Sequence, residues 1–181
     1  MNLTLITGPM KSGKSFEMIN RLAPLKHANI NFAIYQSSKN KRDDEIKSRN
    51  GVSINAIKIS SLKEISDKNV SLIGIDEIHM FDEEEVVVIE KMLKNNIDFI
   101  VSGLNTDYRG KMFSTIKKLL EIFPSEIVFK KAVCESCKNT NAVYTQVLKN
   151  NNPILNGLPS IIPEDGTCYY KPVCRNCFIK E

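Results

Sequence analysis

The sequence predicts an α/β protein in which a mostly parallel sheet is flanked by helices, with a small second domain at its C-terminal end. Short apolar runs typical of buried strands alternate with segments of helical spacing from Leu3 to about Phe129, which favours parallel strands joined by helices. Beyond about Lys130 this pattern gives way to cysteines and turn residues. We therefore expect two domains, residues 1–131 and residues 132–181.

Composition excludes several classes of protein. The chain has 181 residues, of which 42% are hydrophobic and 25% charged, as in an ordinary globular protein with one good core. Its formal charge of +4 is small and scattered, so it indicates neither a nucleic-acid partner nor a membrane surface. No segment approaches the roughly 20 apolar residues of a membrane span, and the first residues lack the basic region of an export signal. We expect a cytoplasmic protein.

The first half of the chain opens with a strand, a loop and a helix. Residues 3–7 form an apolar run that stops at a glycine, and helical spacing follows from 14 to about 26. Pro24 lacks a backbone donor, so we expect the helix to bend or end near it. The further elements expected here are a strand at 32–36, a mobile, solvated loop at 37–50, a strand at 56–59 and a short helix at 61–68 that opens with a Ser-x-x-Glu capping box.

The second half continues the alternation of strands and helices. Residues 72–75 form an apolar strand that ends at Asp76. Residues 82–95 are predicted as a helix with Asp82 as its N-cap, although the three valines at 86–88 would alone favour a strand. The remaining elements expected are a strand at 97–102, a glycine-bounded loop at 103–113, a helix at 114–123 and a closing strand at 127–129.

A phosphate-binding loop lies between the first strand and the first helix. Residues 8–15 fit G-x-x-x-x-G-K-S, whose glycines let backbone N–H groups point at phosphates beside the positive end of a helix. This indicates a P-loop NTPase-like domain that binds ATP with Mg²⁺. Lys14 is expected at the β- and γ-phosphates and Ser15 on the metal. The alternative is a glycine-rich turn with a chance Lys-Ser. The loop residues are Gly8, Pro9, Met10, Lys11, Ser12, Gly13, Lys14 and Ser15.

Two adjacent carboxylates follow the strand at 72–75. Asp76 stands where such enzymes hold the metal and its water, and we favour Glu77 as the general base that takes a proton from an attacking hydroxyl. The alternative is that the pair only caps a strand. Ile78 and His79 complete Asp-Glu-Ile-His, which also matches the D-E-x-H box of nucleic-acid-dependent ATPases, but a histidine here is more often a packed, hydrogen-bonded residue.

Four cysteines form two C-x-x-C pairs in the last part of the chain. Each pair can chelate from one tight turn, and four thiolates in tetrahedral geometry suit a structural Zn²⁺ with no open position. Redox-active dithiols are the alternative. A fifth cysteine, Cys168, is expected to be a bystander. The expected metal ligands are Cys134, Cys137, Cys174 and Cys177.

Five blocks, in order, resemble the motifs of the zinc-containing (type II) thymidine kinases, and the likeness runs over nearly the whole chain. These blocks are residues 8–15 (G-P-M-x-S-G-K-[ST]), 76–81 (D-E-x-Q-F-F), 103–110 (G-L-x-x-D-F-R-G), 132–137 with 142–145 (the first cysteine pair and a strand), and 170–177 (Y-x-x-x-C-R-x-C). The resemblance implies transfer of the γ-phosphoryl group of ATP to the 5′-hydroxyl of thymidine, giving thymidine monophosphate for DNA synthesis. It also implies a homotetramer and feedback inhibition by thymidine triphosphate.

The resemblance also implies roles for individual residues. Glu77 takes the role of the base. The expected ATP- and Mg²⁺-binding residues are those of the phosphate loop together with Asp76, Glu77, Ile78, His79 and Arg42, the last as a candidate phosphate contact. A loop of about 149–170 from the zinc ribbon is expected to fold over the nucleoside as a lid and to exclude water. The expected thymidine-binding residues are Met10, Met80, Tyr108, Phe113, Thr145, Ile161, Ile162, Pro163, Glu164, Asp165 and Tyr170.

Some positions depart from the family pattern. His79 replaces a glutamine and Met80 a phenylalanine, so one wall of the expected nucleoside pocket is less aromatic. Asn40 stands where an aspartate is usual, and Asp165 and Cys168 replace a glycine and an acidic residue of the lid.

Two competing functions come from other classes. One is a nucleic-acid-dependent ATPase, but such helicases need two P-loop sheets and an aromatic stacking series, and 181 residues hold one such loop. The other is a zinc-ribbon adaptor that binds nucleotide without turnover, against which the intact Lys14, Ser15, Asp76 and Glu77 argue. We expect thymidine and ATP as substrates, with neither a nucleic-acid nor a membrane partner.

Overall fold

The protein is built on a six-stranded, wholly parallel sheet, which confirms the predicted α/β fold class. The computed structural model describes residues 1–40, 45–47, 53–66, 69–162 and 166–180. The strand order is β5-β2-β6-β7-β1-β8, and every neighbouring pair is parallel. The strands are β1 (Leu3–Gly8), β2 (Phe32–Ser37), β5 (Ile57–Ile59), β6 (Leu72–Asp76), β7 (Asp98–Leu104) and β8 (Glu126–Phe129).

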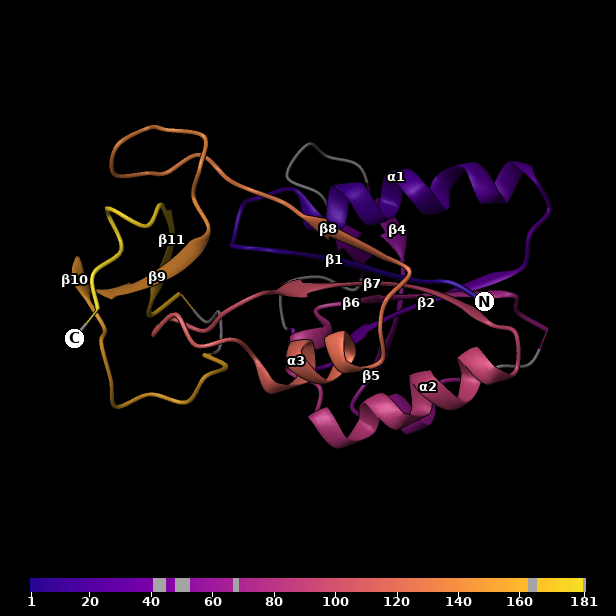
Figure 1. Cartoon of the computed structure of the whole chain (residues 1–181). Coiled ribbons are helices and arrows are strands. Elements are labelled where there is room, and N and C mark those ends of the chain that lie inside the picture. The colour runs from indigo at the N-terminus through magenta and orange to yellow at the C-terminus, as the bar shows by residue number, and fades with distance from the viewer. Residues whose placement is uncertain (41–44, 48–52, 67–68, 163–165, 181) are drawn as a thin grey trace.

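Helices cover both faces of this sheet. Helix α1 (Lys14–His27) lies on one face, and α2 (Val86–Lys94) and α3 (Ser114–Glu121) lie on the other (Figure 1). Each face has its own apolar cluster: Met18 and Leu22 of α1 pack over β1 and β2, whereas Ile89 and Leu119 pack under β6 and β7. Strands buried on both sides explain why β1 and β6 read as continuous apolar runs.

Two short paired strands were not predicted from the sequence, and the first of them lies inside the segment 37–50 that was expected to be a loop. Strands β3 (Glu45–Lys47) and β4 (Ser53–Asn55) pair antiparallel, so the prediction of a loop over 37–50 was wrong at 45–47. Ile46 and Ile54 are buried in the cluster that contains α1. Each strand offers only one apolar anchor within a polar segment, which is too little for a periodic signal.

Several element ends differ from the sequence prediction. Pro24 lies inside α1, which runs on to His27, since one missing donor does not end a helix that packs along one side. The expected helix at 61–68 is a single 3-10 turn (Leu62–Glu64), with the Ser61 capping box confirmed. The three valines at 86–88 are helical as predicted, but Asp82 makes no side-chain cap to the 3-10 turn Glu83–Glu85 that precedes α2.

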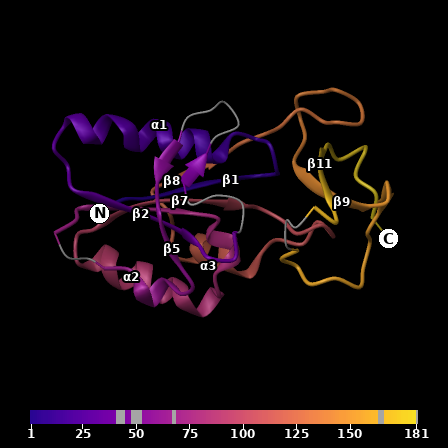
Figure 2. The same cartoon turned by 180° about the vertical axis from the view of Figure 1, so that it is seen from behind.

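The C-terminal segment forms a small lobe with its own sheet. Strands β9 (Tyr144–Lys149), β10 (Asn152–Pro153) and β11 (Tyr169–Val173) pair antiparallel in the order β10-β9-β11. A compact apolar cluster beside them includes Cys134, Ala142 and Val173. The lobe lies beyond the carboxyl ends of the parallel strands (Figures 1 and 2), the edge at which α/β proteins bind ligands.

Two short 3-10 turns lie between β6 and α2: Ile78–Met80 comes just after the strand, and Glu83–Glu85 leads into α2. Of the described helices, none combines the length and apolar character that a bilayer span would need.

Candidate active site

The phosphate loop connects β1 to α1, in the context that the sequence predicted. Gly8 has φ 150°, and a Cβ there would lie 2.2 Å from the carbonyl oxygen of Lys130, so a side chain cannot be accommodated. Gly13 has φ 81° and stands immediately before the first residue of α1. The loop is thus curled against β8 and placed at the positive end of a helix, which is the arrangement that binds phosphate.

The polar side chains of this loop have different partners, and Ser15 reaches the end of β6. Ser15 Oγ donates to Asp76 Oδ2 at 3.0 Å, and Lys14 Nζ donates to the carbonyl oxygen of Pro9 at 2.8 Å. Ser12 Oγ is buried and has no hydrogen-bond partner among the described residues. A buried hydroxyl without a hydrogen-bond partner is free to donate a hydrogen bond to an oxygen atom of a ligand.

Asp76 is buried at the end of β6 and is surrounded by donors. Its carboxylate accepts hydrogen bonds from the Ser15 and Ser102 hydroxyls and from the Glu77 N–H. Burial, together with the nearby charge of Glu77, nevertheless raises the pKa of Asp76 to about 6. A cation at this position would reverse that shift, because it stabilises the ionised carboxylate. The chemistry and position of Ser15 and Asp76 therefore fit Mg²⁺.

Glu77 has a strained backbone at the start of the pocket. Its φ of 54° is in the left-handed region, which a residue with a Cβ adopts at a cost of about 1–2 kcal/mol. This conformation turns the chain sharply, so that the Glu77 side chain faces the pocket while Asp76 faces the phosphate loop. Strain of this kind concentrates at functional sites.

His79 is buried and electrically neutral. Burial, with a smaller contribution from the positive charge of Lys14, lowers the pKa of His79 to about 3. Its Nδ1 accepts a hydrogen bond from the Leu104 N–H at 3.2 Å and lies 3.5 Å from Glu77 Oε2. A neutral ring whose Nδ1 already accepts a hydrogen bond forms no ion pair with that carboxylate. The His79 ring also packs 4.7 Å from the ring of Phe113.

One narrow pocket, partly open to solvent, joins the two lobes. Glu77 and Met10 contribute from the phosphate-binding side, and Thr145 Oγ1 accepts a hydrogen bond from the Met10 N–H at 2.9 Å. The eight described residues that were expected to bind thymidine all line this pocket: Met10, Met80, Tyr108, Phe113, Thr145, Ile161, Ile162 and Tyr170.

Five further expected site residues remain: one lies in the core, and four lie outside the described residues. Ile78 is fully buried in the main apolar cluster. Arg42 and the segment 163–165, which contains Pro163, Glu164 and Asp165, lie outside the described residues.

The segment between β10 and β11 is fastened over this pocket by hydrogen bonds. Tyr108 Oη donates to the Leu158 carbonyl at 2.8 Å and accepts from the Leu158 N–H at 3.2 Å. Arg109 Nη2 donates to Ser160 Oγ at 2.7 Å, and Tyr170 Oη donates to the Ile162 carbonyl at 2.8 Å. Contacts from two lobes thus hold residues 154–162, hereafter the lid segment, against the pocket.

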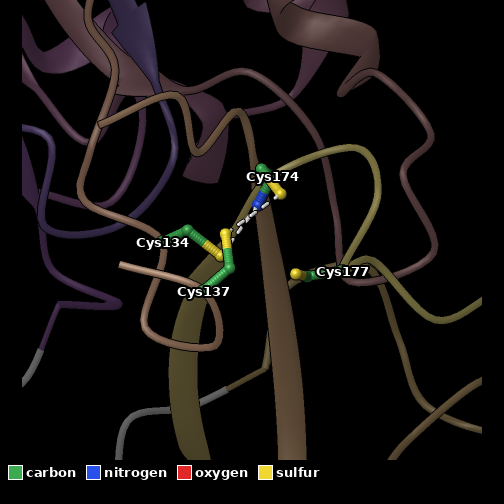
Figure 3. Close-up of side chains that lie close together, drawn as sticks. All are labelled: Cys134, Cys137, Cys174 and Cys177. Carbon is green, nitrogen blue, oxygen red and sulfur yellow. Dashed lines mark hydrogen bonds between the residues drawn. The ribbon is translucent and has the colours of Figure 1, made fainter. Parts of the chain in front are cut away.

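The four paired cysteines converge on one point, as the sequence predicted. Their sulfur atoms all lie within 4.8 Å of one another, although each pair comes from a different turn (Figure 3). Burial opposes ionisation of Cys134, but N–H groups of Cys137, Cys174 and Ser136 lower its pKa to about 6. The adjacent sulfurs raise the pKa of Cys177 to about 12. Ionisation of all four thiols at one point requires a cation that offsets their mutual repulsion, so the cluster fits a structural metal site.

Sequence reasoning missed several residues of the site. Ser102, at the end of an apolar run in β7, donates to Asp76, and Leu104, Thr106 and Ser160 line the pocket. Ser102 reaches Asp76 because β6 and β7 are neighbours in the sheet. The carboxyl ends of strands are the usual ligand edge, so Ser102 carried a weak signal, but the strand order was not readable from the sequence.

Comparison with known proteins places this geometry in a family context. The family model described as "Thymidine kinase" matches residues 1–178. A curated protein named thymidine kinase from Mycoplasma mobile is 34% identical over 183 residues, which cover 98% of this chain and 87% of that protein. Another, from Mycoplasmoides gallisepticum, is 34% identical over 177 residues, covering 94% of this chain and 78% of that protein.

Proposed function

The chain belongs to the thymidine kinase family, and we propose that it transfers the γ-phosphoryl group of ATP to the 5′-hydroxyl of thymidine, forming ADP and thymidine monophosphate. One observation carries the proposal: the pocket that contains Glu77 continues into the phosphate loop at Met10 and is closed by the lid segment. A phosphate-binding loop and an enclosed organic pocket within reach of one carboxylate are what a nucleoside kinase requires.

Each polar group at the phosphate side has a role in this reaction. The N–H groups of residues 8–15 and the start of α1 bind the triphosphate, and Lys14 exchanges its contact with the Pro9 carbonyl for the β- and γ-phosphates. Ser15 and Asp76 would hold Mg²⁺, which supplies positive charge to the phosphate oxygens when bound with ATP. Arg42 is proposed as a further phosphate contact. Ile78 and His79 were also expected to bind ATP and Mg²⁺, but both are buried, so we propose that they support this segment from beneath.

Glu77 acts as the general base. Its carboxylate accepts the proton of the thymidine 5′-hydroxyl as that oxygen forms a bond to the γ-phosphorus and the bond to the ADP oxygen breaks. The His79 ring beside it is neutral, so it forms no ion pair with this carboxylate. The left-handed backbone at residue 77 separates this carboxylate from the metal-facing Asp76.

The nucleoside occupies the enclosed side of the pocket. Met10, Met80, Tyr108, Phe113 and Thr145 would surround the thymine ring, and residues 161–165 with Tyr170 would bind it from the lid. Tyr108 and Tyr170 already use their hydroxyls to hold the backbone at Leu158 and Ile162, which supports binding of the base through main-chain groups. The lid excludes water that would otherwise hydrolyse ATP.

Residues 132–181 are proposed to act as a distinct ribbon domain, held by Zn²⁺ on Cys134, Cys137, Cys174 and Cys177. Four sulfur ligands leave no open position, so the metal stabilises the lobe and takes no part in the reaction. Further proposals are a cytoplasmic homotetramer and feedback inhibition by thymidine triphosphate. That nucleotide carries both a thymine and a triphosphate, so it suits both halves of the same pocket.

The direct test is ADP release from ATP and Mg²⁺ by the purified protein, with thymidine, each other deoxynucleoside or single-stranded DNA as the only addition. We expect turnover with thymidine and labelled thymidine monophosphate as the product. If thymidine produced no ADP release but single-stranded DNA stimulated it, the kinase proposal would be rejected in favour of a nucleic-acid-dependent ATPase. Nucleotide binding without any turnover would favour a non-catalytic adaptor.

A further inference from the structure

Three side chains from distant parts of the chain form a closed triangle beside the phosphate loop. Lys11 Nζ donates to Glu135 Oε1 at 2.6 Å and to Tyr169 Oη at 2.9 Å, and Tyr169 Oη donates to Glu135 Oε2 at 2.6 Å. The Lys11 ammonium also lies 4.4 Å from the centre of the Tyr169 ring. Every pair within the set is in direct contact, and we call it the Lys11 clasp.

The clasp joins three functional segments. Lys11 belongs to the phosphate loop, Glu135 lies between the cysteines of the first pair, and Tyr169 is the first residue of β11, where the chain returns from the lid segment. The Glu135 N–H donates to the Pro172 carbonyl at 3.0 Å, so the backbone at Glu135 is bound to β11 as well. The position of Glu135 therefore depends on the turn that the metal would hold.

The clasp also acts on a strained part of the loop. Lys11 has φ 62°, and a residue with a Cβ occupies that region at a cost of about 1–2 kcal/mol. The side chains of Lys11 and Glu135 are only 18% and 27% exposed, so their ion pair is stronger and more fixed than a pair on the open surface. The ion pair is present with Lys11 in the left-handed region, so it offsets part of the cost of that backbone conformation.

We infer that Lys11, Glu135 and Tyr169 couple the metal-bound ribbon to the phosphate loop, so that ATP affinity depends on the ribbon through Lys11. The inference rests on the proposed function and assigns Lys11 the part of a positioning residue. Thr145 Oγ1 and the Met10 N–H supply a second contact between the same lobes, one residue away.

A competing role for Lys11 predicts an opposite result. If the Lys11 ammonium bound the phosphates directly, Glu135 would be a competitor that holds it away, and Glu135→Gln would tighten ATP binding. If the clasp positions the loop, Glu135→Gln instead weakens ATP binding, because the left-handed conformation at Lys11 loses its support. The sign of the effect therefore separates the two roles.

The experiment measures the Kd of a non-hydrolysable ATP analogue with Mg²⁺ by calorimetry, on metal-loaded protein whose zinc content is determined for each variant. We expect Lys11→Met and Glu135→Gln each to raise the Kd by about three- to tenfold. The Kd of the double variant should not exceed that of the single variant that binds more weakly, because both changes remove the same ion pair. The Kd for thymidine should stay within about twofold of wild type. Lys131→Met, at an exposed lysine beside the ribbon, is the matched control and should bind as wild type does.

Tyr169→Phe provides a second variant that leaves the cysteine turns intact and should weaken ATP binding in the same direction. Additive effects of Lys11→Met and Glu135→Gln, tighter binding by Glu135→Gln, or unchanged binding by Tyr169→Phe would each overturn the inference. Failure of the wild-type protein to bind the analogue would reject the proposed function instead.

Discussion

Two adjacent carboxylates at the end of β6 have different environments, although they differ by only one CH₂. Asp76 is buried among hydroxyl and N–H donors, whereas Glu77 opens onto the pocket. The left-handed φ at Glu77 causes this separation, since it directs consecutive side chains to different sites. Asp76 is thereby suited to hold a metal ion, and Glu77 is suited to accept a proton from a substrate in the pocket.

We predict that Glu77→Gln lowers the rate of phosphoryl transfer by about 10²–10⁴-fold, the usual contribution of a positioned general base. Glutamine keeps the size of the side chain but does not accept the proton. Single-turnover formation of thymidine monophosphate would measure the rate, and calorimetry should show that ATP binding is nearly unchanged. Glu84→Gln, at an exposed position, is the control. An unchanged rate in Glu77→Gln would assign the base to another group.

Asp76 should make stability fall as pH rises, in the absence of Mg²⁺ and nucleotide. Its pKa is raised from 3.8 to about 6 in the folded protein, so the folded state binds the proton more tightly than the unfolded state does. The carboxyl is neutral in both states below about pH 4 and ionised in both above about pH 6. The free energy of unfolding therefore declines between these values, by roughly 2–3 kcal/mol at 1.36 kcal/mol per pKa unit.

Urea unfolding of wild type and Asp76→Asn at pH 4 and pH 7 tests this prediction. The stability of Asp76→Asn relative to wild type should rise by roughly 2–3 kcal/mol from pH 4 to pH 7. The pKa of His79 is lowered, which gives the opposite pH dependence, but His79 is present in both proteins and its effect cancels. Asp82→Asn, at an exposed carboxylate, should show no such rise. Parallel pH profiles for wild type and Asp76→Asn would contradict the assignment.

At the scale of elements, the cysteine turns and β11 hold the lid segment at its far end. Cys174 directly follows β11, and the lid segment returns to the fold through that strand. Few apolar residues support this small lobe, so a metal is expected to supply much of its stability.

We predict that Cys174→Ser abolishes stoichiometric zinc retention and raises the KM for thymidine at least severalfold, because β11 and the lid lose their anchor. Cys168→Ser makes the same chemical change in the same lobe but outside the sulfur cluster, and it should keep both metal and thymidine affinity. Metal analysis after gel filtration and steady-state kinetics measure the two properties. A Cys174→Ser protein with full zinc content would remove Cys174 from the ligand set.

At the scale of the whole molecule, the pocket lies between two lobes that share no strand. The large sheet supplies Glu77 and the phosphate loop, and the small lobe supplies Thr145 and the lid segment. Function therefore depends on the contacts between lobes, of which the two hydrogen bonds between Tyr108 and Leu158 are central.

Removal of the Tyr108 hydroxyl should free the lid segment from its hydrogen bonds at Leu158, while the aromatic ring stays packed in place. Tyr108→Phe is predicted to raise the KM for thymidine by about five- to 150-fold, as expected for two lost hydrogen bonds worth about 0.5–1.5 kcal/mol each, with little change in the KM for ATP. Tyr144→Phe, whose ring stacks on Phe178 away from the lid, is the matched control. Equal effects of the two variants would show that Tyr108 has no special role in closing the pocket.

Local signals explain which features were predictable. The phosphate loop, the strand that ends at Asp76 and the two C-x-x-C pairs depend on neighbouring residues, because a turn, a helix start and a chelating loop are each encoded within a few positions. The periodicity of apolar residues indicated the alternation of strands and helices for the same reason. The hairpin β3–β4 gave no such signal, since one buried isoleucine per strand does not make a pattern.

The sequence by itself determined the parallel α/β class, the position of the phosphate loop and the residue types available for catalysis and metal binding. Only the tertiary structure decided that Ser102 donates to Asp76, that Leu158 binds Tyr108, and that Glu135 holds Lys11. The physical reason is sequence separation. These contacts join residues 26 to 124 positions apart, and their formation depends on strand order and on how the two lobes pack, which no local pattern encodes.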